Sequence, residues 1–362
     1  MSAPKYIVDS DLKDILEKVE AGERLSFDDG YKLFRSHDLL SIGYMATLVR
    51  ERLHGKKVYW VFNQHLNYTN VCLNLCKFCA FGKPKGHPEA YEIDIEEAVK
   101  KLKSGAPVRE IHIVGGLHPD LPYSYYLELL QRIKEALPEV QIKAFTCVEI
   151  AHLAKIGRKS IREVLQDLQA AGLTCLPGGG AEIFAERIRK QLCPKKISGQ
   201  EWLEIARTAH SLGIPTNATM LYGHIETIEE RLEHLLALRE LQDETKGFLC
   251  FIPLPFLPQK SYLRGEVAPT TGFTDLKMIA ISRLMLDNIP HIKAYWLFLG
   301  LKLAQVALKF GADDLHGTVI EEKISELSGV DEKKALSRRE LERLISEAGY
   351  IPVERDALYN PV

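Results

Sequence analysis

The first 55 residues show only the spacing of apolar positions that is typical of helices. Apolar side chains three and four residues apart form one helical face, at Leu12, Ile15, Leu16 and Val19. Further helices are predicted to begin near Ser26, where Asp29 completes a capping sequence, and near Leu39, with Gly55 after the last. The pattern therefore predicts a helical extension over residues 1–56.

After this extension, short β-rich runs alternate with amphipathic helical stretches. Several helical stretches begin with a side chain that can cap the first turn, followed by a carboxylate. These predicted caps are Asp94, Ser160, Ser198, Thr227 and Thr274. The predicted strands cover residues 58–66, 110–115, 141–148, 174–176, 216–222, 248–254 and 292–299, with a weaker one at 313–316.

Eight strands that alternate with helices indicate a parallel sheet. Closed on itself, the sheet would be a (β/α)8 TIM-type barrel, and left open it would be doubly wound. We favour the α/β barrel, over residues 57–320, because no glycine-rich dinucleotide fingerprint follows the first strand. A last helix is predicted to begin at Ser337, followed by a proline-containing tail over residues 351–362. Residues 321–362 are expected to pack on the barrel.

Composition excludes some classes of protein. The 362 residues include 47 Lys and Arg against 49 Asp and Glu, so there is no basic excess for nucleic acid or an anionic membrane. No apolar run approaches the roughly 18 residues of a membrane span. The start, Met1-Ser2-Ala3-Pro4, shows no export signal. Seven cysteines, an odd number, argue against a disulfide framework and for the reducing cytoplasm.

Three of the cysteines lie together directly after the first predicted strand, as Cys72-x3-Cys76-x2-Cys79. In a barrel this loop belongs to the face that carries the chemistry. A structural zinc site could recruit His87 as a fourth ligand. An iron–sulfur cluster on three thiolates would instead leave one iron open to a substrate. The other cysteines are single and are expected to be packing residues, at Cys147, Cys175, Cys193 and Cys250.

The cysteine spacing, with Phe78 beside the last cysteine, resembles the signature of the radical S-adenosylmethionine (SAM) enzymes. The resemblance implies a [4Fe-4S] cluster on Cys72, Cys76 and Cys79 whose open iron binds the amino and carboxylate groups of SAM. An electron from a donor such as flavodoxin or ferredoxin would cleave the sulfonium and release a 5′-deoxyadenosyl radical.

Other segments resemble the SAM-binding elements of that family. Gly115 and Gly116 resemble the pair whose backbone meets the methionyl amino group, although a tight turn would also use glycines. Glu149 occupies the place of a ribose ligand, and the strand near Leu221 resembles the adenine-binding stretch. A solvated carboxylate and a buried apolar strand are the alternatives.

The triple glycine that includes Gly179, together with Glu182, could bring backbone amides to a carboxylate or to the ribose. A plain turn after the fourth strand would have the same sequence.

Within the superfamily, the chain most resembles the futalosine-pathway enzymes of menaquinone biosynthesis, in particular the aminodeoxyfutalosine synthases. The matching segments are residues 112–120, 143–146, 177–184, 217–227, 241–245 and 251–256. The resemblance implies a transferase that adds the adenosyl radical to 3-[(1-carboxyvinyl)oxy]benzoate. Loss of a carboxyl group as CO2 or bicarbonate would then yield aminodeoxyfutalosine, with methionine as the other product.

Such a reaction needs a dry pocket and donors for two carboxylates. Donors at predicted strand ends are His65, Asn67, His118, Asn217, His224 and Lys293, although a single histidine is more often a core or capping residue. Two alternatives stay open: a dehypoxanthine futalosine cyclase, which would release free 5′-deoxyadenosine, and a noncatalytic metal-binding protein.

Overall fold

In the computed structural model, the strands form a closed parallel barrel. The structure describes residue 7 and residues 10–105, 107–328 and 335–362. One group of strands is β2 (Asn63–Leu66), β3 (Glu110–Ile113), β4 (Gln141–Ala144) and β5 (Leu173–Cys175). A second is β6 (Thr216–Tyr222), β7 (Phe248–Pro255) and β8 (His291–Ile292), and a third pairs β9 (Asp314–Gly317) with β1 (Lys57–Val61). Bridges from Leu176 to Thr216, Lys293 to Asp314 and Gln64 to Ile320 join the groups into a ring. The prediction of an α/β TIM-type barrel is confirmed, and the first predicted strand is divided at Phe62 into β1 and β2.

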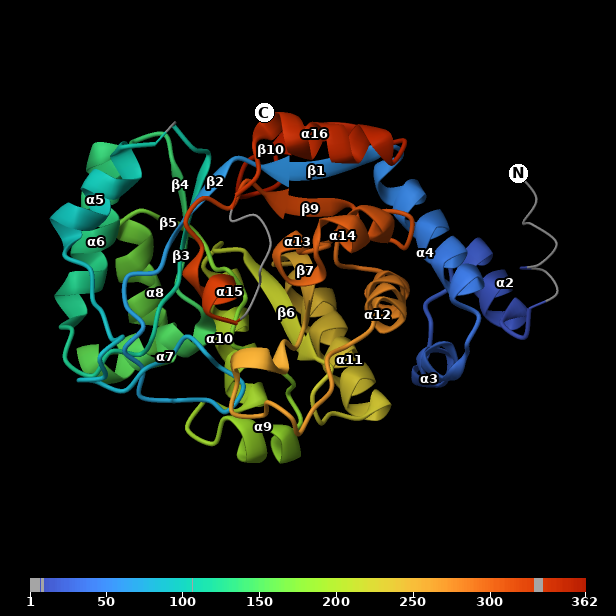
Figure 1. Cartoon of the computed structure of the whole chain (residues 1–362), viewed down its shortest axis with the longest axis horizontal. Coiled ribbons are helices and arrows are strands. Elements are labelled where there is room, and N and C mark those ends of the chain that lie inside the picture. Colours follow the sequence, from blue (N-terminus) through green and yellow to red (C-terminus); the bar gives the residue numbers. More distant parts are fainter. Residues whose placement is uncertain (1–6, 8–9, 106, 329–334) are drawn as a thin grey trace.

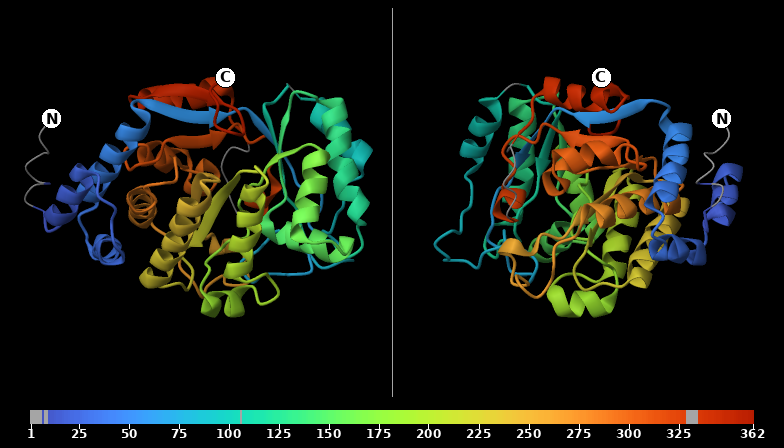
Figure 2. Two further views of the ribbon diagram at one scale, coloured as in Figure 1. Left: turned by 180° about the vertical axis from the view of Figure 1, so that it is seen from behind. Right: turned by 45° about the vertical axis from the view of Figure 1, so that its right-hand side comes forward.

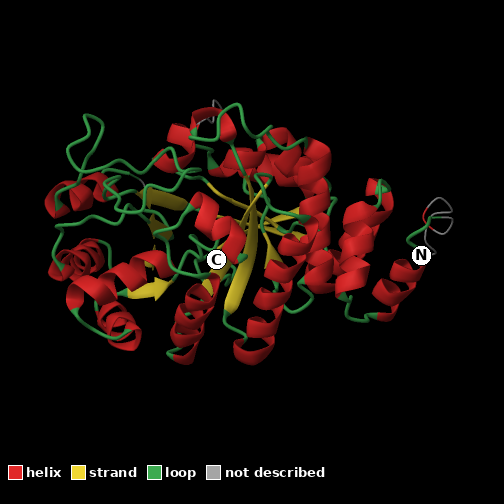
Figure 3. Cartoon of the chain, turned by 90° about the horizontal axis from the view of Figure 1, so that it is seen from below, coloured by secondary structure: helices red, strands yellow, loops and turns green. Residues whose placement is uncertain are grey.

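Helices surround the strands (Figure 3). Their bounds are α5 (Ile95–Lys103), α6 (Tyr123–Ala136), α7 (Cys147–Gly157), α8 (Ile161–Ala170), α9 (Glu186–Leu192), α10 (Gly199–Ser211), α11 (Ile228–Thr245), α12 (Gly272–Met285), α13 (Trp296–Leu299), α14 (Leu301–Ala307) and α15 (Lys323–Ser328). Asp94, Ser160, Ser198 and Thr227 accept backbone amides at helix starts, as predicted. The predicted cap at Thr274 is wrong, because Thr271 caps α12 and Thr274 lies inside the helix. No described helix is both long and apolar enough to cross a membrane.

Two predicted strands extend well past the observed strand, and one strand was not predicted. The run at 141–148 ends as a strand at Ala144, because Thr146 and Glu149 form a capping box that begins α7. The run at 292–299 is a strand only at its first residue and continues into α13. The predicted tail contains a further strand, β10 (Ile351–Arg355), which pairs in parallel with β1.

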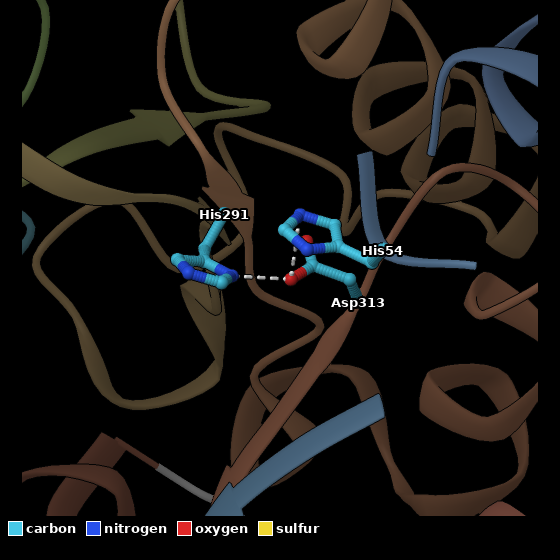
Figure 4. A group of neighbouring side chains, drawn as sticks. All are labelled: His54, His291 and Asp313. Carbon is cyan, nitrogen blue, oxygen red and sulfur yellow. Dashed lines mark hydrogen bonds and ion pairs between the residues drawn. The ribbon is translucent and has the colours of Figure 1, made fainter. Parts of the chain in front are cut away.

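The amino-terminal extension packs on one side of the barrel. It consists of α2 (Lys13–Ala21), α3 (Phe27–Arg35) and α4 (Leu39–His54), and α4 lies along α12 while α3 contacts α11 (Figure 1). His54 and His291 both lie against the carboxylate of Asp313, at 3.4 Å and 2.5 Å (Figure 4). Arg283 donates to the other oxygen of Asp313, so this carboxylate is already neutralised and ties α4 to the barrel. Residues 1–6, where no export signal was predicted, lie outside the described residues.

The carboxyl-terminal segment closes the end of the barrel opposite the cysteine loop. Helix α16 (Arg338–Glu347) is capped by Ser337 as predicted, and β10 lies beside β1 (Figure 2). The chain then turns into the barrel, where Ala357 is fully buried and its amide donates to the Gln141 side chain over 2.6 Å. The division of the chain at residues 57 and 320 stays a prediction.

Candidate active site

A cavity of about 320 Å³ lies at the carboxyl ends of the strands. Its walls include the cysteine loop after β2, the glycine loops after β3 and β5, and the apolar side chains of Ile252, Leu254 and Phe256 from β7 and the residues after it. These are the loops in which a (β/α)8 barrel holds its chemistry. The cavity is therefore the candidate active site.

All three clustered cysteines line this cavity as thiols. The amide of Gly82 donates to Cys79 Sγ over 3.3 Å. A Cβ added to Gly82 would lie 3.8 Å from Cys79 Sγ and 4.0 Å from Cys72 Sγ, so the glycine leaves open the space beside both sulfurs. Burial raises the pKa of Cys79 to about 11, so an unliganded Cys79 would hold its proton. Positive charge at this loop would be needed to stabilise the thiolate.

The spread of the thiols fits a cluster better than a single ion. Around one tetrahedral zinc, sulfurs at about 2.3 Å from the metal lie roughly 3.8 Å apart. Among the described residues, the three thiols do not form a set whose ligand atoms all lie within 4.8 Å of one another. His87, the fourth ligand of the zinc alternative, does not line the cavity, and its Nδ1 accepts the amide of Glu89 over 3.1 Å. The donors present therefore fit an iron–sulfur cluster.

Cys193 does more than pack. The sequence predicts a simple core role for Cys193, and its side chain is buried. The neighbouring Cys193 thiol, with the positive charge of Lys196, also lowers the pKa of the Cys76 thiol. Lys196 also pairs with Glu182 over 2.6 Å and lies 5.2 Å from the ring centre of Phe78. Phe78, Glu182 and Lys196 all line the cavity beside the cysteines.

The two glycines after β3 lie against the cysteine loop. A Cβ on Gly116 would overlap the carbonyl oxygen of Val71, and one on Gly115 would meet the ring of Tyr68 at 2.6 Å. The amide of Gly116 donates to Thr69 over 2.8 Å. The glycines are thus required for close packing of these two loops, and both also line the cavity.

Glu149 holds the glycine loop after β3 in place through hydrogen bonds. Its carboxylate accepts from the Gly115 amide at 3.0 Å, the Tyr68 hydroxyl at 2.9 Å and the Thr146 amide at 2.7 Å. Burial raises the pKa of Glu149 to about 7 despite these donors. Glu149 lines the cavity, and its carboxylate already accepts hydrogen bonds from protein groups. Its predicted role toward the ribose stays a prediction.

The loop after β5 approaches β6 closely. Gly178 has a φ of +80°, and a Cβ there would overlap the backbone of Asn217, so only glycine fits. Gly179 and Gly180 line the cavity, as do Thr219 and Leu221 of β6. The predicted SAM-binding residues Phe78, Gly115, Gly116, Glu149, Gly179, Glu182 and Leu221 are therefore gathered around one cavity.

The predicted substrate donors are gathered less completely. His65 lines the cavity, and Lys293 lies directly behind it, with Nζ 3.1 Å from Nδ1 of His316. The polar atoms of Asn67 and His118 are used in hydrogen bonds within the protein. Asn67 binds the backbone of Val114 and Lys323. Nδ1 of His118 accepts two backbone amides. Asn217 is buried without lining the cavity, and the ring of His224 binds the Leu221 carbonyl over 3.0 Å.

Two histidines of the cavity were not predicted as site residues, His112 and His316. His112 pairs in register with His65 across β2 and β3. The alternation of Glu110, His112 and Val114 with Ile111 and Ile113 was the available signal, because alternate residues of a strand face the same side. His316 lies within β9, which the sequence predicts only weakly, and it has no comparable signal.

The chain matches two protein-family models and several known proteins. Residues 66–238 match the model of the radical SAM superfamily, and residues 245–362 match that of the CofH/MqnC C-terminal region. The chain is 51% identical to the aminodeoxyfutalosine synthase of Thermus thermophilus, covering 98% of this chain and 97% of the relative. It is 45% identical to that of Streptomyces coelicolor, covering 97% and 94%.

Relatives with another name also match. The 5-amino-6-(D-ribitylamino)uracil–L-tyrosine 4-hydroxyphenyl transferase of Methanopyrus kandleri is 41% identical, with 92% of this chain and 90% of the relative covered. Among solved structures, methylornithine synthase has the same fold, with a TM-score of 0.74 at 20% identity over 93% of this chain and 96% of that one.

The chain belongs to the radical SAM superfamily, in the family that includes the aminodeoxyfutalosine synthases of the futalosine pathway. It is a radical SAM enzyme that acts on a small molecule, as the resemblance implied. Membership of this family implies a [4Fe-4S] cluster and SAM.

Proposed function

We propose that this enzyme transfers the 5′-deoxyadenosyl group of SAM to the enol-ether double bond of 3-[(1-carboxyvinyl)oxy]benzoate. The products are aminodeoxyfutalosine, methionine and the lost carboxyl group as CO2 or bicarbonate. The observation that carries the proposal is one cavity with three thiols at its mouth, an apolar wall from β7, and histidines in its depth. The relatives named aminodeoxyfutalosine synthase support it.

Cys72, Cys76 and Cys79 would hold the cluster, which supplies the electron that cleaves SAM. The chain's own residues then bind and orient. Gly115 and Gly116 present backbone near the cysteine loop, and Glu149 holds that backbone in place. The Lys196–Glu182 ion pair places the ammonium of Lys196 beside the ring of Phe78. The apolar side chains of Ile252, Leu254 and Phe256 exclude water from the reacting carbons.

The direct test is the mass of the product. Reconstituted, reduced enzyme is incubated with SAM and the enol-ether substrate, and the products are separated. We expect an adduct that retains the adenosyl moiety, together with one methionine per adduct. Free 5′-deoxyadenosine without an adduct would instead assign the enzyme to the cyclases. An as-isolated protein with about one zinc and no iron or sulfide would place it among noncatalytic metal proteins.

Removal of any cluster thiolate should abolish cluster binding. We expect Cys72→Ala, Cys76→Ala and Cys79→Ala each to lose most bound iron and sulfide after anaerobic reconstitution, and with them all SAM cleavage. Cys147→Ala is the matched control, because Cys147 is fully buried and does not line the cavity. Iron and sulfide analysis measures the loss directly. Full SAM cleavage by any of the three variants would contradict the ligand assignment.

The reaction requires a low-potential electron donor, for which we propose a flavodoxin or ferredoxin, and we propose the cytoplasm as its location. Neither a nucleic acid nor a membrane enters the proposed reaction.

A further inference from the structure

Three histidines form the floor of the cavity, and we call His65, His112 and His316 the histidine floor. His65 and His112 are adjacent in the β2–β3 register, and their rings stack at 4.5 Å with an angle of 4°. His316 meets His65 edge to face at 5.6 Å. The cysteine loop and both glycine loops follow the carboxyl ends of the strands, so the floor lies one layer deeper than the thiols.

The hydrogen bonds of the floor define its protons. As an ammonium, Lys293 Nζ is only a donor, so at 3.1 Å it donates to Nδ1 of His316. The proton of His316 is then on Nε2, which donates toward Nε2 of His65 at 3.4 Å. His65 therefore carries its proton on Nδ1. Burial lowers the pKa of all three histidines, so each ring is neutral and carries one N–H, and that of His316 is directed at His65.

A layer of buried charged side chains lies beneath the floor and contains one more cation than carboxylates. Its members are Glu110, Lys143, Lys293, Asp314 and Arg355. Lys143 pairs with Glu110 at 2.5 Å, and Nε of Arg355 donates to Asp314 at 2.7 Å. Lys293 is the third cation of this layer, and it lies 3.8 Å from Asp314, which Arg355 already occupies. Three buried cations thus face two buried carboxylates. A buried charge without a partner is costly, so an anion bound above Lys293 would be strongly favoured.

Other carboxyl groups of the cavity do not supply this anion. Glu149, Glu182 and Glu322 all follow the carboxyl ends of their strands, and each has its own donors. The floor also has unused hydrogen-bonding capacity, because Nδ1 of His112 is buried and has no partner among the described residues. A metal ion does not fit, since the ring nitrogens of the floor do not form a set within 4.8 Å of one another among the residues described.

We propose that the histidine floor, with Lys293 behind it, binds the ring carboxylate of an aromatic acid substrate and so sets the direction in which that substrate enters. The inference rests on the proposed function. In that reaction the enol-ether carbons must lie near the thiol end of the cavity, where SAM is cleaved. The ring carboxylate is the opposite end of the substrate, and the wall of Ile252 and Leu254 between floor and mouth suits the ring.

The test compares binding of two probes to the reconstituted, unreduced enzyme. Isothermal titration measures the Kd of 3-[(1-carboxyvinyl)oxy]benzoate and of the analogue in which the ring carboxylate is a carboxamide. We expect the wild type to prefer the carboxylate by roughly tenfold or more, and Lys293→Met to lose that preference with little change for the carboxamide. His112→Phe, which keeps a flat ring in the stack, should lose the preference as well. His87→Gln is the control, because His87 lies outside the cavity.

The outcomes separate the two proposals. Equal wild-type affinity for the two probes, or an unchanged preference in both variants, overturns the floor as the carboxylate site even if the adduct is formed. A third probe carries a carboxamide in place of the enol-ether carboxylate. If Lys293→Met instead loses the preference for the enol-ether carboxylate, the proposed direction of substrate binding is overturned. Absence of any adduct from wild-type enzyme that still distinguishes the probes removes the proposed function and leaves the carboxylate site.

Discussion

At the scale of single residues, His234 shows how burial fixes a protonation state. Its Nδ1 accepts the amide of Phe184 at 3.3 Å, and its Nε2 donates to the Thr219 carbonyl at 3.0 Å. Its ring also stacks on Phe184 at 3.9 Å. Burial lowers the pKa of His234 to about 3. A second proton would point at a backbone N–H, so the folded protein accepts only the neutral ring.

This histidine should make the protein sensitive to acid. The unfolded chain binds a proton near pH 6.5 and the folded chain does not, so the stabilising contribution is complete above pH 6.5 and is lost as the pH falls toward 3. At pH 5 the loss is about 2 kcal/mol. Urea unfolding at pH 7 and pH 5 measures it. His234→Gln keeps one donor and one acceptor, and its decrease between the two pH values should be smaller by about that amount. Equal decreases in both proteins would show that His234 does not titrate in this way.

Residue chemistry was predictable where it is local in the chain. The three cysteines lie within eight residues, so their spacing alone indicates a shared site. The histidine floor joins strands that are far apart in sequence, and only the register of β2 with β3 and the closure by β9 bring its rings together. Asn67 and His118 were plausible donors by position, but their polar atoms bind neighbouring backbone and side chains, which the sequence does not show.

At the scale of elements, the contact between the glycine loop and the cysteine loop should control cluster binding. Gly116→Ala would force the added Cβ onto the Val71 carbonyl, directly before Cys72. The loops must separate, at a cost of about 1–3 kcal/mol for overpacking. We expect a melting temperature several degrees lower, at the roughly 2–4 °C per kcal/mol typical of large domains, and less iron per chain after reconstitution.

Gly105→Ala is the matched control for Gly116→Ala. A Cβ there would lie 3.7 Å from Oε1 of Gln64, an ordinary contact, so iron content and melting temperature should match the wild type. If Gly116→Ala binds as much iron as Gly105→Ala, the contact between the two loops does not hold the cysteines in place.

Elements were predictable where the local signal is complete. Capping sequences at Asp94, Ser160 and Thr227 mark real helix starts because each cap bonds within its own first turn. The run at 292–299 is apolar throughout, and an apolar run fits a buried strand and a buried helix equally well. Strand β10 was missed because it contains Pro352, which a parallel neighbour on one side tolerates.

At the scale of the whole molecule, the barrel keeps its chemistry and its closure at opposite ends. The thiols and glycine loops follow the carboxyl ends of the strands, whereas the carboxyl-terminal tail enters from the other end. Arg355, in the carboxyl-terminal segment, connects that segment to the interior of the barrel. It is fully buried, and it bonds Asp314 in the layer directly beneath the histidine floor.

Two substitutions that remove one positive charge from this layer should therefore differ in effect. Lys293→Met removes the surplus cation, so the melting temperature should hold or rise while the carboxylate preference is lost. Arg355→Met removes the direct partner of Asp314, and breaking a buried pair costs about 3–5 kcal/mol. Lys293, 3.8 Å from Asp314, would then be drawn to that carboxylate and away from His316, so affinity for the ring carboxylate should fall as well. Thermal unfolding and titration of both variants measure these effects. Equal destabilisation by the two substitutions would show that Lys293 is not the surplus charge, and that the layer needs all three cations.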